Sequence, residues 1–192
     1  MTTTLNASTA GAGGFIATSD NSGILALQTA GTTALSIDAS QNVTTTNKFA
    51  KASMPLGSVL QVVSNTLSAS SSTSSTSFVA STLITTITPT SATSKILILL
   101  NGGTRDSNQS LNSQQTAMYR NIASAGYSSL SNMEGVFYNS SNSVGGHTFN
   151  YLDSPATTSS ISYQPYFKVT NGGSVWFNNG GVVSLTLMEI AA

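Results

Sequence analysis

The sequence predicts an all-β protein, and three observations carry this prediction. Apolar residues nowhere recur with the spacing of an amphipathic helix over ten residues. Short runs rich in β-branched residues are instead separated by clusters of Gly, Asn and Ser, which is typical of strands joined by turns. Ser, Thr, Gly and Asn are also abundant throughout the chain, and all four are poor helix formers.

Residues 1–50 contain a weak internal repeat. Apolar triplets begin at Phe15, Leu25 and Leu35, and a turn cluster of small polar residues follows each triplet. Because side chains alternate along a strand, each triplet places two apolar residues on one face. Three strands with so little apolar bulk cannot bury enough surface to fold alone.

The repeat makes physical sense if identical chains share the apolar face. Three copies around an axis would form a closed prism with few free edges. We therefore expect residues 1–50 to form a trimeric β-prism-like stem, with an unordered Thr-, Ser- and Ala-rich arm as the alternative. The residues expected at the trimer interface are Phe15, Leu25, Leu27, Leu35 and Ile37.

A linker over residues 51–57 leads to a single domain over 58–192. The run Ile96–Leu100 is apolar on both faces, so it predicts a central strand that is covered on both sides. Asn171, Gly172 and Gly173 predict a tight hairpin between the strand before them and Val175–Phe177. Trp176 faces away from its two neighbours, either as a core or interface residue or as an exposed stacking platform.

Other segments of this domain alternate between apolar and polar residues in the manner of half-buried strands. They are Val59–Val63, Thr116–Ile122, Met133–Tyr138, His147–Leu152, Ile161–Val169 and Val183–Leu187. Eight or nine short strands with long polar loops predict a two-sheet β-sandwich of jelly-roll type. We therefore expect a stem followed by a sandwich head.

The scarcity of charge excludes several classes of partner. Only 6% of the residues are charged, with six basic and six acidic side chains, so no basic surface for nucleic acid or anionic lipid is expected. The absence of Cys excludes disulfides and thiolate zinc sites. The first residues lack the pattern of a secretion signal, and the longest aliphatic run is too short for membrane insertion.

Few residues are available for catalysis. His147 is the single His, and it shares a strand face with Phe149 and Tyr151, which favours a buried position. A Ser-His-Asp site would need His147 and Asp153, yet the chain lacks a nucleophile elbow. The acids left for a glycosidase pair are Asp106, Glu134 and Asp153, and no spacing singles out two of them. We therefore expect no enzyme activity, no catalytic residue, no metal site and no cofactor.

Three loops of the head, 102–115, 123–132 and 139–146, are rich in Asn, Ser, Gln and Gly. Amide and hydroxyl groups form hydrogen bonds without strong charge, and aromatic rings stack on the faces of sugars. Such loops suit weak, multivalent recognition of glycans or protein tips. The candidate receptor-binding residues in these loops are Arg105, Asp106, Tyr127 and Asn142.

Two segments resemble a known family of virus proteins. The segment Gly23–Val43 resembles the short-strand repeats in the shafts of bacteriophage tail fibres. The segments Gly57–Val63 and Ile87–Leu100 resemble a C-terminal domain of phage fibre-like proteins, especially those of environmental and cyanobacterial phages. The resemblance implies a homotrimeric virion protein with a docked N-terminal stem and an outward-facing head, and it brings no catalytic residues.

The expected function is therefore that of a non-catalytic phage fibre protein, located in the virion and binding a host-surface glycan or protein through its head. Its N-terminal segment would dock on phage tail or capsid proteins. A second possibility is a capsid decoration protein or a head fibre, anchored by its N-terminus on the capsid. A sugar-degrading enzyme of the virion is a third.

Overall fold

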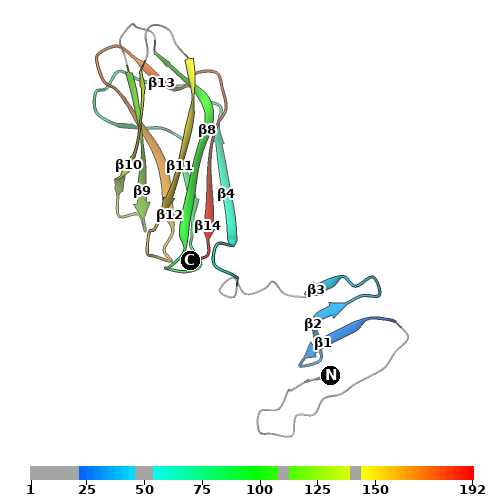
Figure 1. Ribbon diagram of the computed structural model, residues 1–192. Helices are drawn as coiled ribbons and strands as arrows, with labels where there is room; N and C mark the ends of the chain where they lie inside the picture. Colours follow the sequence, from blue (N-terminus) through cyan, green and yellow to red (C-terminus); the bar gives the residue numbers. More distant parts are fainter. Residues whose placement is uncertain (1–21, 46–53, 108–112, 139–143) are drawn as a thin grey trace. The chain divides into compact units, whose positions relative to one another are not determined.

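A computed structural model of the chain describes residues 22–45, 54–107, 113–138 and 144–192. Every regular element in these ranges is a β-strand, and the chain divides into two compact units, Met1–Phe49 and Ala50–Ala192 (Figure 1). The predicted all-β fold class is therefore confirmed.

The first unit contains a three-stranded antiparallel sheet. Its strands are β1 (Leu25–Thr29), β2 (Thr32–Ile37) and β3 (Val43–Thr45). The two residues between β1 and β2, Ala30 and Gly31, have φ angles of 51° and 75°. Positive φ at both positions is the conformation that matches the twist of a two-residue hairpin. Gly31 suits its position because glycine adopts a positive φ without strain.

The predicted apolar residues of the stem pair with one another across β1 and β2. Leu25 lies opposite Ile37, and Leu27 lies opposite Leu35. Leu25 is 58% exposed and Leu27 is 44% exposed, whereas Leu35 and Ile37 are half-buried. The first predicted triplet, at Phe15, lies outside the described residues. The strand β3 was not among the predicted triplets. Within one chain, this sheet leaves much of its apolar surface uncovered.

The turn between β2 and β3 depends on Asp38. Its Oδ1 accepts hydrogen bonds from the backbone N–H groups of Ser40 and Asn42, both at 2.9 Å, and its Oδ2 accepts one from Asn42 Nδ2 at 3.0 Å. The bonds from Asn42 hold the pKa of Asp38 below its usual 3.8. The pKa of Asp38 is lower in the folded state than in the unfolded state. The ionised carboxylate therefore stabilises the turn fully at pH values above the unfolded-state pKa. That stabilisation is lost as the pH falls through the folded pKa.

Acidification is therefore expected to loosen this turn. Amide hydrogen exchange on the full chain should show the protection factor of the Asn42 amide falling as the pH drops below the ordinary Asp pKa of about 3.9. Asp38→Asn keeps an acceptor that does not titrate, so its protection should be independent of pH. The same pH dependence in both proteins would show that Asp38 is not responsible.

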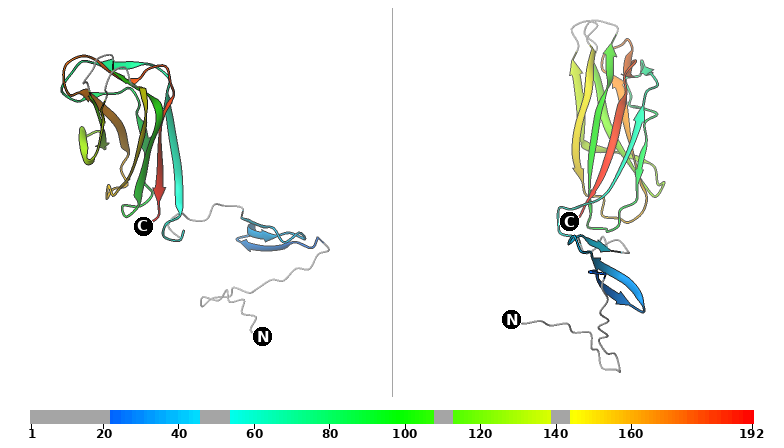
Figure 2. Two further views of the ribbon diagram at one scale, coloured as in Figure 1. Left: turned by 45° about the horizontal axis from the view of Figure 1, so that its top comes forward. Right: turned by 90° about the vertical axis from the view of Figure 1, so that its right-hand side faces the viewer.

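The second unit consists of two antiparallel sheets packed face to face, seen as separate layers in Figure 2. The first, which we call the β12 sheet, has the strand order β10-β9-β12-β6, and β7 also pairs with β12. Its strands are β6 (Val79–Ala80), β7 (Thr85–Ile87), β9 (Ser113–Ile122), β10 (Tyr127–Tyr138) and β12 (Ile161–Val169).

The other layer, which we call the β8 sheet, has the strand order β4-β14-β8-β13-β5, and β11 pairs with the other edge of β8. Its strands are β4 (Val59–Leu67), β5 (Ser71–Thr73), β8 (Lys95–Ser107), β11 (Val144–Asp153), β13 (Val175–Asn178) and β14 (Val183–Ile190). The two-sheet character of the predicted head is therefore present in the structure.

The core lies between the two sheets, and β8 is central to it as predicted. Ile96, Ile98 and Leu100 are fully buried against the β12 sheet. Leu97 and Leu99 alternate with them on the outer face of the sheet and are only half-buried. The run was predicted to be covered on both faces. Within a single chain only its inner face is fully buried.

The predicted hairpin at Asn171–Gly173 is wrong. β12 belongs to one sheet and β13 to the other, so the turn carries the chain between the two layers. The glycines do have the expected positive φ, 44° at Gly172 and 86° at Gly173, but a turn signal fixes the local reversal and not the pairing partner. Packing of Phe167 on Phe177, with ring centroids 5.5 Å apart, joins the two strands across the core.

Candidate binding site

The predicted receptor-binding residues do not lie together in loops. Arg105 and Asp106 belong to the end of β8, which continues to Ser107, and both pair with β11. The expected loop 102–115 is therefore mostly strand. Asn142 lies outside the described residues. Tyr127 opens β10 directly after a short turn, and it belongs to a group of aromatic side chains on the β12 sheet.

This group, which we call the aromatic cluster, consists of Phe78, Tyr119, Tyr127 and Tyr166. Tyr119 and Tyr166 stack with ring centroids 3.9 Å apart and an interplanar angle of 26°. Tyr127 lies 5.9 Å from Tyr166, and Phe78 meets the edge of Tyr119 at 6.0 Å. All four side chains are half-buried, so their packing on one another leaves part of each ring accessible.

Strand register explains why these residues meet. Tyr166 alternates with the buried Phe167 on β12 and therefore points away from the core. Tyr119 on β9 lies opposite Gln164, two residues before Tyr166, so the two rings are diagonal neighbours. Tyr127 on β10 lies opposite Asn121, two residues after Tyr119. The cluster thus covers the outer face of three adjacent strands.

The polar groups around the cluster are mostly neutral. Among the described residues, the charged side chain in contact with the cluster is Lys168, whose Nζ lies 4.5 Å from the centre of the Phe78 ring. Burial raises the pKa of the Tyr166 hydroxyl, and the neighbouring Tyr127 and Tyr119 raise it further. The Tyr166 phenol therefore remains protonated at neutral pH and can serve as a hydrogen-bond donor and acceptor.

Rings flanked by amides and hydroxyls suit a sugar better than they suit acid–base chemistry. Pyranose faces stack on tyrosine rings, while the phenol groups match the hydroxyls of a sugar. Sequence reasoning missed Phe78, Tyr119 and Tyr166. Tyr166 lies within a segment that was predicted to alternate, but its contact with Tyr119 depends on the strand register, which a sequence pattern does not fix.

A second polar group, Arg120, Asp153 and Tyr163, joins the two sheets. Arg120 Nη1 lies 2.8 Å from both carboxylate oxygens of Asp153, and the Tyr163 hydroxyl donates to Asp153 Oδ2 at 2.7 Å. Arg120 and Tyr163 pair across β9 and β12, whereas Asp153 ends β11 in the opposite layer. With its carboxylate held in this way, Asp153 supports the sandwich and is not placed as a catalytic acid.

His147 is buried as predicted, with 2% exposure. Its Nε2 lies 2.7 Å from the Phe177 carbonyl oxygen, and its ring packs on the Phe177 ring at 4.5 Å. Asp153 is six residues further along the same strand, about 20 Å away at the rise of a β-strand. The Ser-His-Asp arrangement considered from the sequence therefore does not form.

Trp176 is half-buried, on the face of β13 opposite the buried Val175 and Phe177. It lies opposite Ser72 of β5 and Asp106 of β8 in the register. Trp176 is thus outside the core between the sheets, and the predicted possibility of a core residue is wrong. An interface role and an exposed stacking role both remain compatible with its position.

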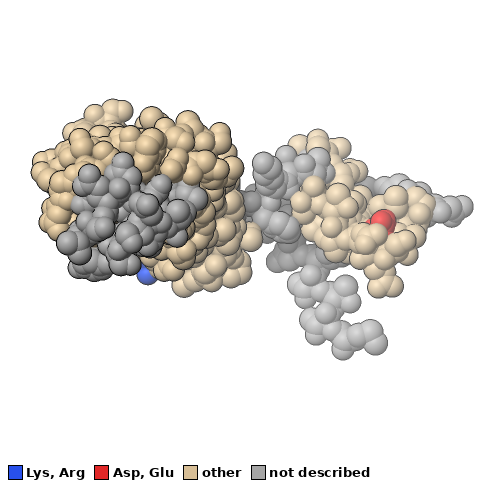
Figure 3. All heavy atoms as spheres, turned by 90° about the horizontal axis from the view of Figure 1, so that it is seen from above, with Lys and Arg blue, Asp and Glu red and all other residues tan. Residues whose placement is uncertain are grey.

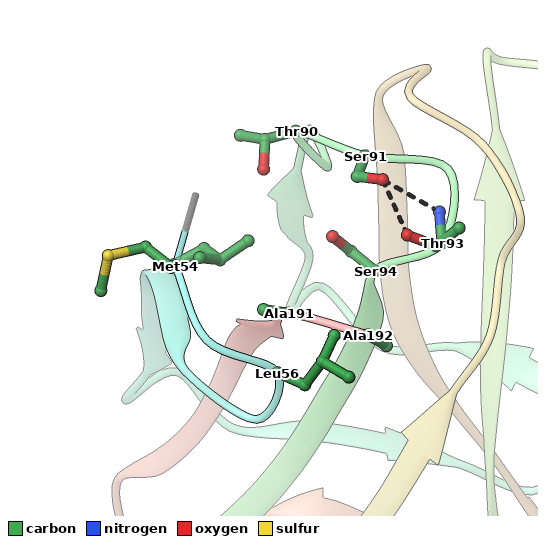
Figure 4. Close-up of a pocket in the computed structure, with 9 residues that line it drawn as sticks. Met54, Leu56, Thr90, Ser91, Thr93, Ser94, Ala191 and Ala192 are labelled. Atoms are coloured by element: carbon green, nitrogen blue, oxygen red, sulfur yellow. Dashed lines mark hydrogen bonds between the residues drawn. The ribbon is translucent and has the colours of Figure 1, made fainter. Parts of the chain in front are cut away.

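A hollow of about 140 Å³ lies at the end of the head that holds Met54, Ala191 and Ala192 (Figure 4). Small hydroxyl residues and apolar side chains line it: Met54, Leu56, Leu60, Thr90, Ser91, Thr93, Ser94, Ala191 and Ala192. The nearby Glu189 is fully buried and accepts hydrogen bonds from Thr90 and Gln61. Burial raises the pKa of Glu189, but the bonds from Thr90 and Gln61 outweigh it and keep the pKa below its usual value. The hollow itself presents no ionisable side chain for chemistry.

Little charge is visible among the described atoms in Figure 3. Within the described ranges, no group of three His, Cys, Asp or Glu side chains is placed to hold a metal ion. The same part of the chain contains no helix of the length and apolarity that a membrane span needs. Comparison with known proteins found no family model and no curated protein that matches the chain.

Proposed function

We propose that this chain is a homotrimeric phage virion fibre protein that binds a host-surface glycan without catalysis. The observation that carries the binding role is the aromatic cluster, where four packed rings share one sheet face with neutral hydrogen-bonding groups. In this proposal the head is a jelly-roll-type sandwich, and the site adjoins Tyr127 at the turn before β10. Weak sites on three heads would gain avidity through their effective concentration.

The trimeric β-prism-like stem is supported by the exposure of its apolar side chains. Leu25 and Leu27 are 58% and 44% exposed in one chain, and packing against two other copies would bury them. The stem would dock on phage tail or capsid proteins and hold the heads outward. Light scattering of the full chain should give three times its 19.6 kDa mass, and a monomer would contradict the proposal.

Tyr166→Ala is expected to weaken glycan binding by about fivefold per site, because a stacked ring contributes on the order of 1 kcal/mol. The measurement is binding of the full-length protein to an array of bacterial surface polysaccharides, beside a thermal melt that confirms folding. Tyr166→Phe keeps the ring and removes the hydroxyl, so it should retain most of the affinity. Wild-type binding by a folded Tyr166→Ala protein would place the glycan site elsewhere.

Antibody labelling of the virus particle tests the location separately. Label on the tail supports the fibre role. Label spread over the capsid would instead favour the decoration role that the sequence left open.

A further inference from the structure

The outer face of the β8 sheet carries a continuous apolar row across four strands. Val62 lies opposite Met188, Met188 opposite Leu97, and Leu97 opposite Leu152. Cross-strand partners project to the same side of a sheet, so these four side chains are neighbours, and we call them the apolar row. Figure 1 shows their strands β4, β14, β8 and β11 side by side. Val62 is 54% exposed and Leu152 is 46% exposed.

The surroundings of the apolar row divide this face into two ends. Ile190 extends the apolar surface on one side of the row, where its partner on β8 is the exposed Lys95. On the other side Leu99 lies between the polar Thr186 and Asn150, so the polar margin begins there. Towards the far end, the corresponding cross-strand positions are polar: Thr66, Ser184, Asn101 and Thr148. An apolar centre with almost no charge and a polar margin is the composition of a protein interface.

The apolar row accounts for a mismatch between the sequence of β8 and the burial of its residues in a single chain. The run Ile96–Leu100 is apolar at every position, as in a strand that is covered on both faces. A single chain covers Ile96, Ile98 and Leu100 and leaves Leu97 and Leu99 on the outside. The stem sheet has the same property, because it also exposes apolar side chains on a sheet. One assembly of identical chains would cover both surfaces.

The width of this sheet fits a threefold arrangement. Four strands spaced about 4.8 Å apart span about 14 Å from the first to the last. Three such sets of strands, placed as the sides of a triangle with about 4.8 Å between neighbouring edge strands, would each lie about 7 Å from the axis. The side chains at the middle of the row, Met188 and Leu97, point from each side towards the axis and would fill the interior. We propose that the apolar row packs against the apolar rows of two other copies around a threefold axis of the heads.

This interface rests on the trimer proposed above, and it is tested in the full chain, which has no native Cys. Val62→Cys places a thiol in the row, and Val182→Cys is the matched control at a Val that is 60% exposed outside the row. In the native protein, maleimide should modify the thiol at position 62 about tenfold or more slowly than that at position 182, because a stable interface opens rarely. Both thiols should react equally in denaturant.

The possible outcomes separate the two proposals. Equal rates in a trimeric protein would overturn the interface and leave the trimer standing, with this face open to some other partner. Equal rates in a monomer would overturn both. Protection of position 62 in a monomer would also overturn the interface, since the chain would then cover the row itself.

A charge placed in the row supplies a second readout. Added to the Val62→Cys protein, Leu97→Asp should restore fast labelling, because three buried carboxylates around one axis would force the heads apart. Asn101→Asp lies on the same strand and face but at the polar end, so it should leave the thiol protected. Equal effects of the two substitutions would argue against the row as the centre of the interface.

Discussion

Asp153→Ala is expected to lower the free energy of unfolding of the head by about 3 kcal/mol. Asp153 receives both hydrogen bonds of the Arg120 Nη1 group, at 2.8 Å, and one from Tyr163. The substitution would leave a guanidinium that is 23% exposed without its carboxylate. It would also leave the fully buried Tyr163 hydroxyl without its acceptor, and burial raises the pKa of that phenol, so it stays protonated. A buried hydroxyl and a largely buried guanidinium that both lose their partner cost more than one lost surface ion pair.

Urea unfolding of the full-length protein, followed by tryptophan fluorescence, measures this loss. Tyr163→Phe removes one hydroxyl and keeps the ring, so it should cost only about 1 kcal/mol. The difference between the two variants in free energy of unfolding measures the contribution of the Arg120–Asp153 ion pair, which joins the two sheets. A similar small cost for both substitutions would mean that the ion pair contributes little and that Asp153 acts mainly through Tyr163.

The sequence pattern predicted burial in this protein better than it predicted pairing. The all-apolar run Ile96–Leu100 was predicted as a central strand, and Ile96, Ile98 and Leu100 do lie in the core. The aromatic residues on the face of its strand favoured a buried His147, because side-chain parity along a strand is a local property. The partner of each strand is not local. The turn at Asn171–Gly173 was therefore recognised, while its use as a passage between layers was not.

The candidate site shows the same division. Tyr127 was identified as an aromatic residue in a polar loop, but Tyr119 and Tyr166 join it only through the register of β9, β10 and β12. The pair Gly102–Gly103 was interpreted as the start of a loop, which misplaced Arg105 and Asp106. Glycines inside a strand also mark bulges, and here the pairing of β8 with β11 shifts between Gly145 and His147, opposite this point.

Gly102→Ala is expected to be among the most damaging single substitutions in the head, at about 4 kcal/mol or more. Gly102 has a φ of +85°, which a residue with a Cβ adopts only under strain. An added Cβ would also lie 2.5 Å from the Val182 carbonyl oxygen. That carbonyl cannot retreat easily, because it accepts a 2.7 Å hydrogen bond from the Gly103 N–H and the following Val183 pairs with Gly102 itself.

Gly180→Ala separates the two causes. Gly180 has nearly the same φ, +82°, but nothing lies within 4 Å of an added Cβ. It should therefore cost only the backbone strain, about 1 kcal/mol. The urea midpoint of Gly180→Ala should stay near the wild-type value, whereas Gly102→Ala should unfold at much lower urea or accumulate as insoluble protein. Equal midpoints for the two variants would mean that strands β8 and β14 separate at little cost, and the close approach at Gly102 would then not be what holds them in register.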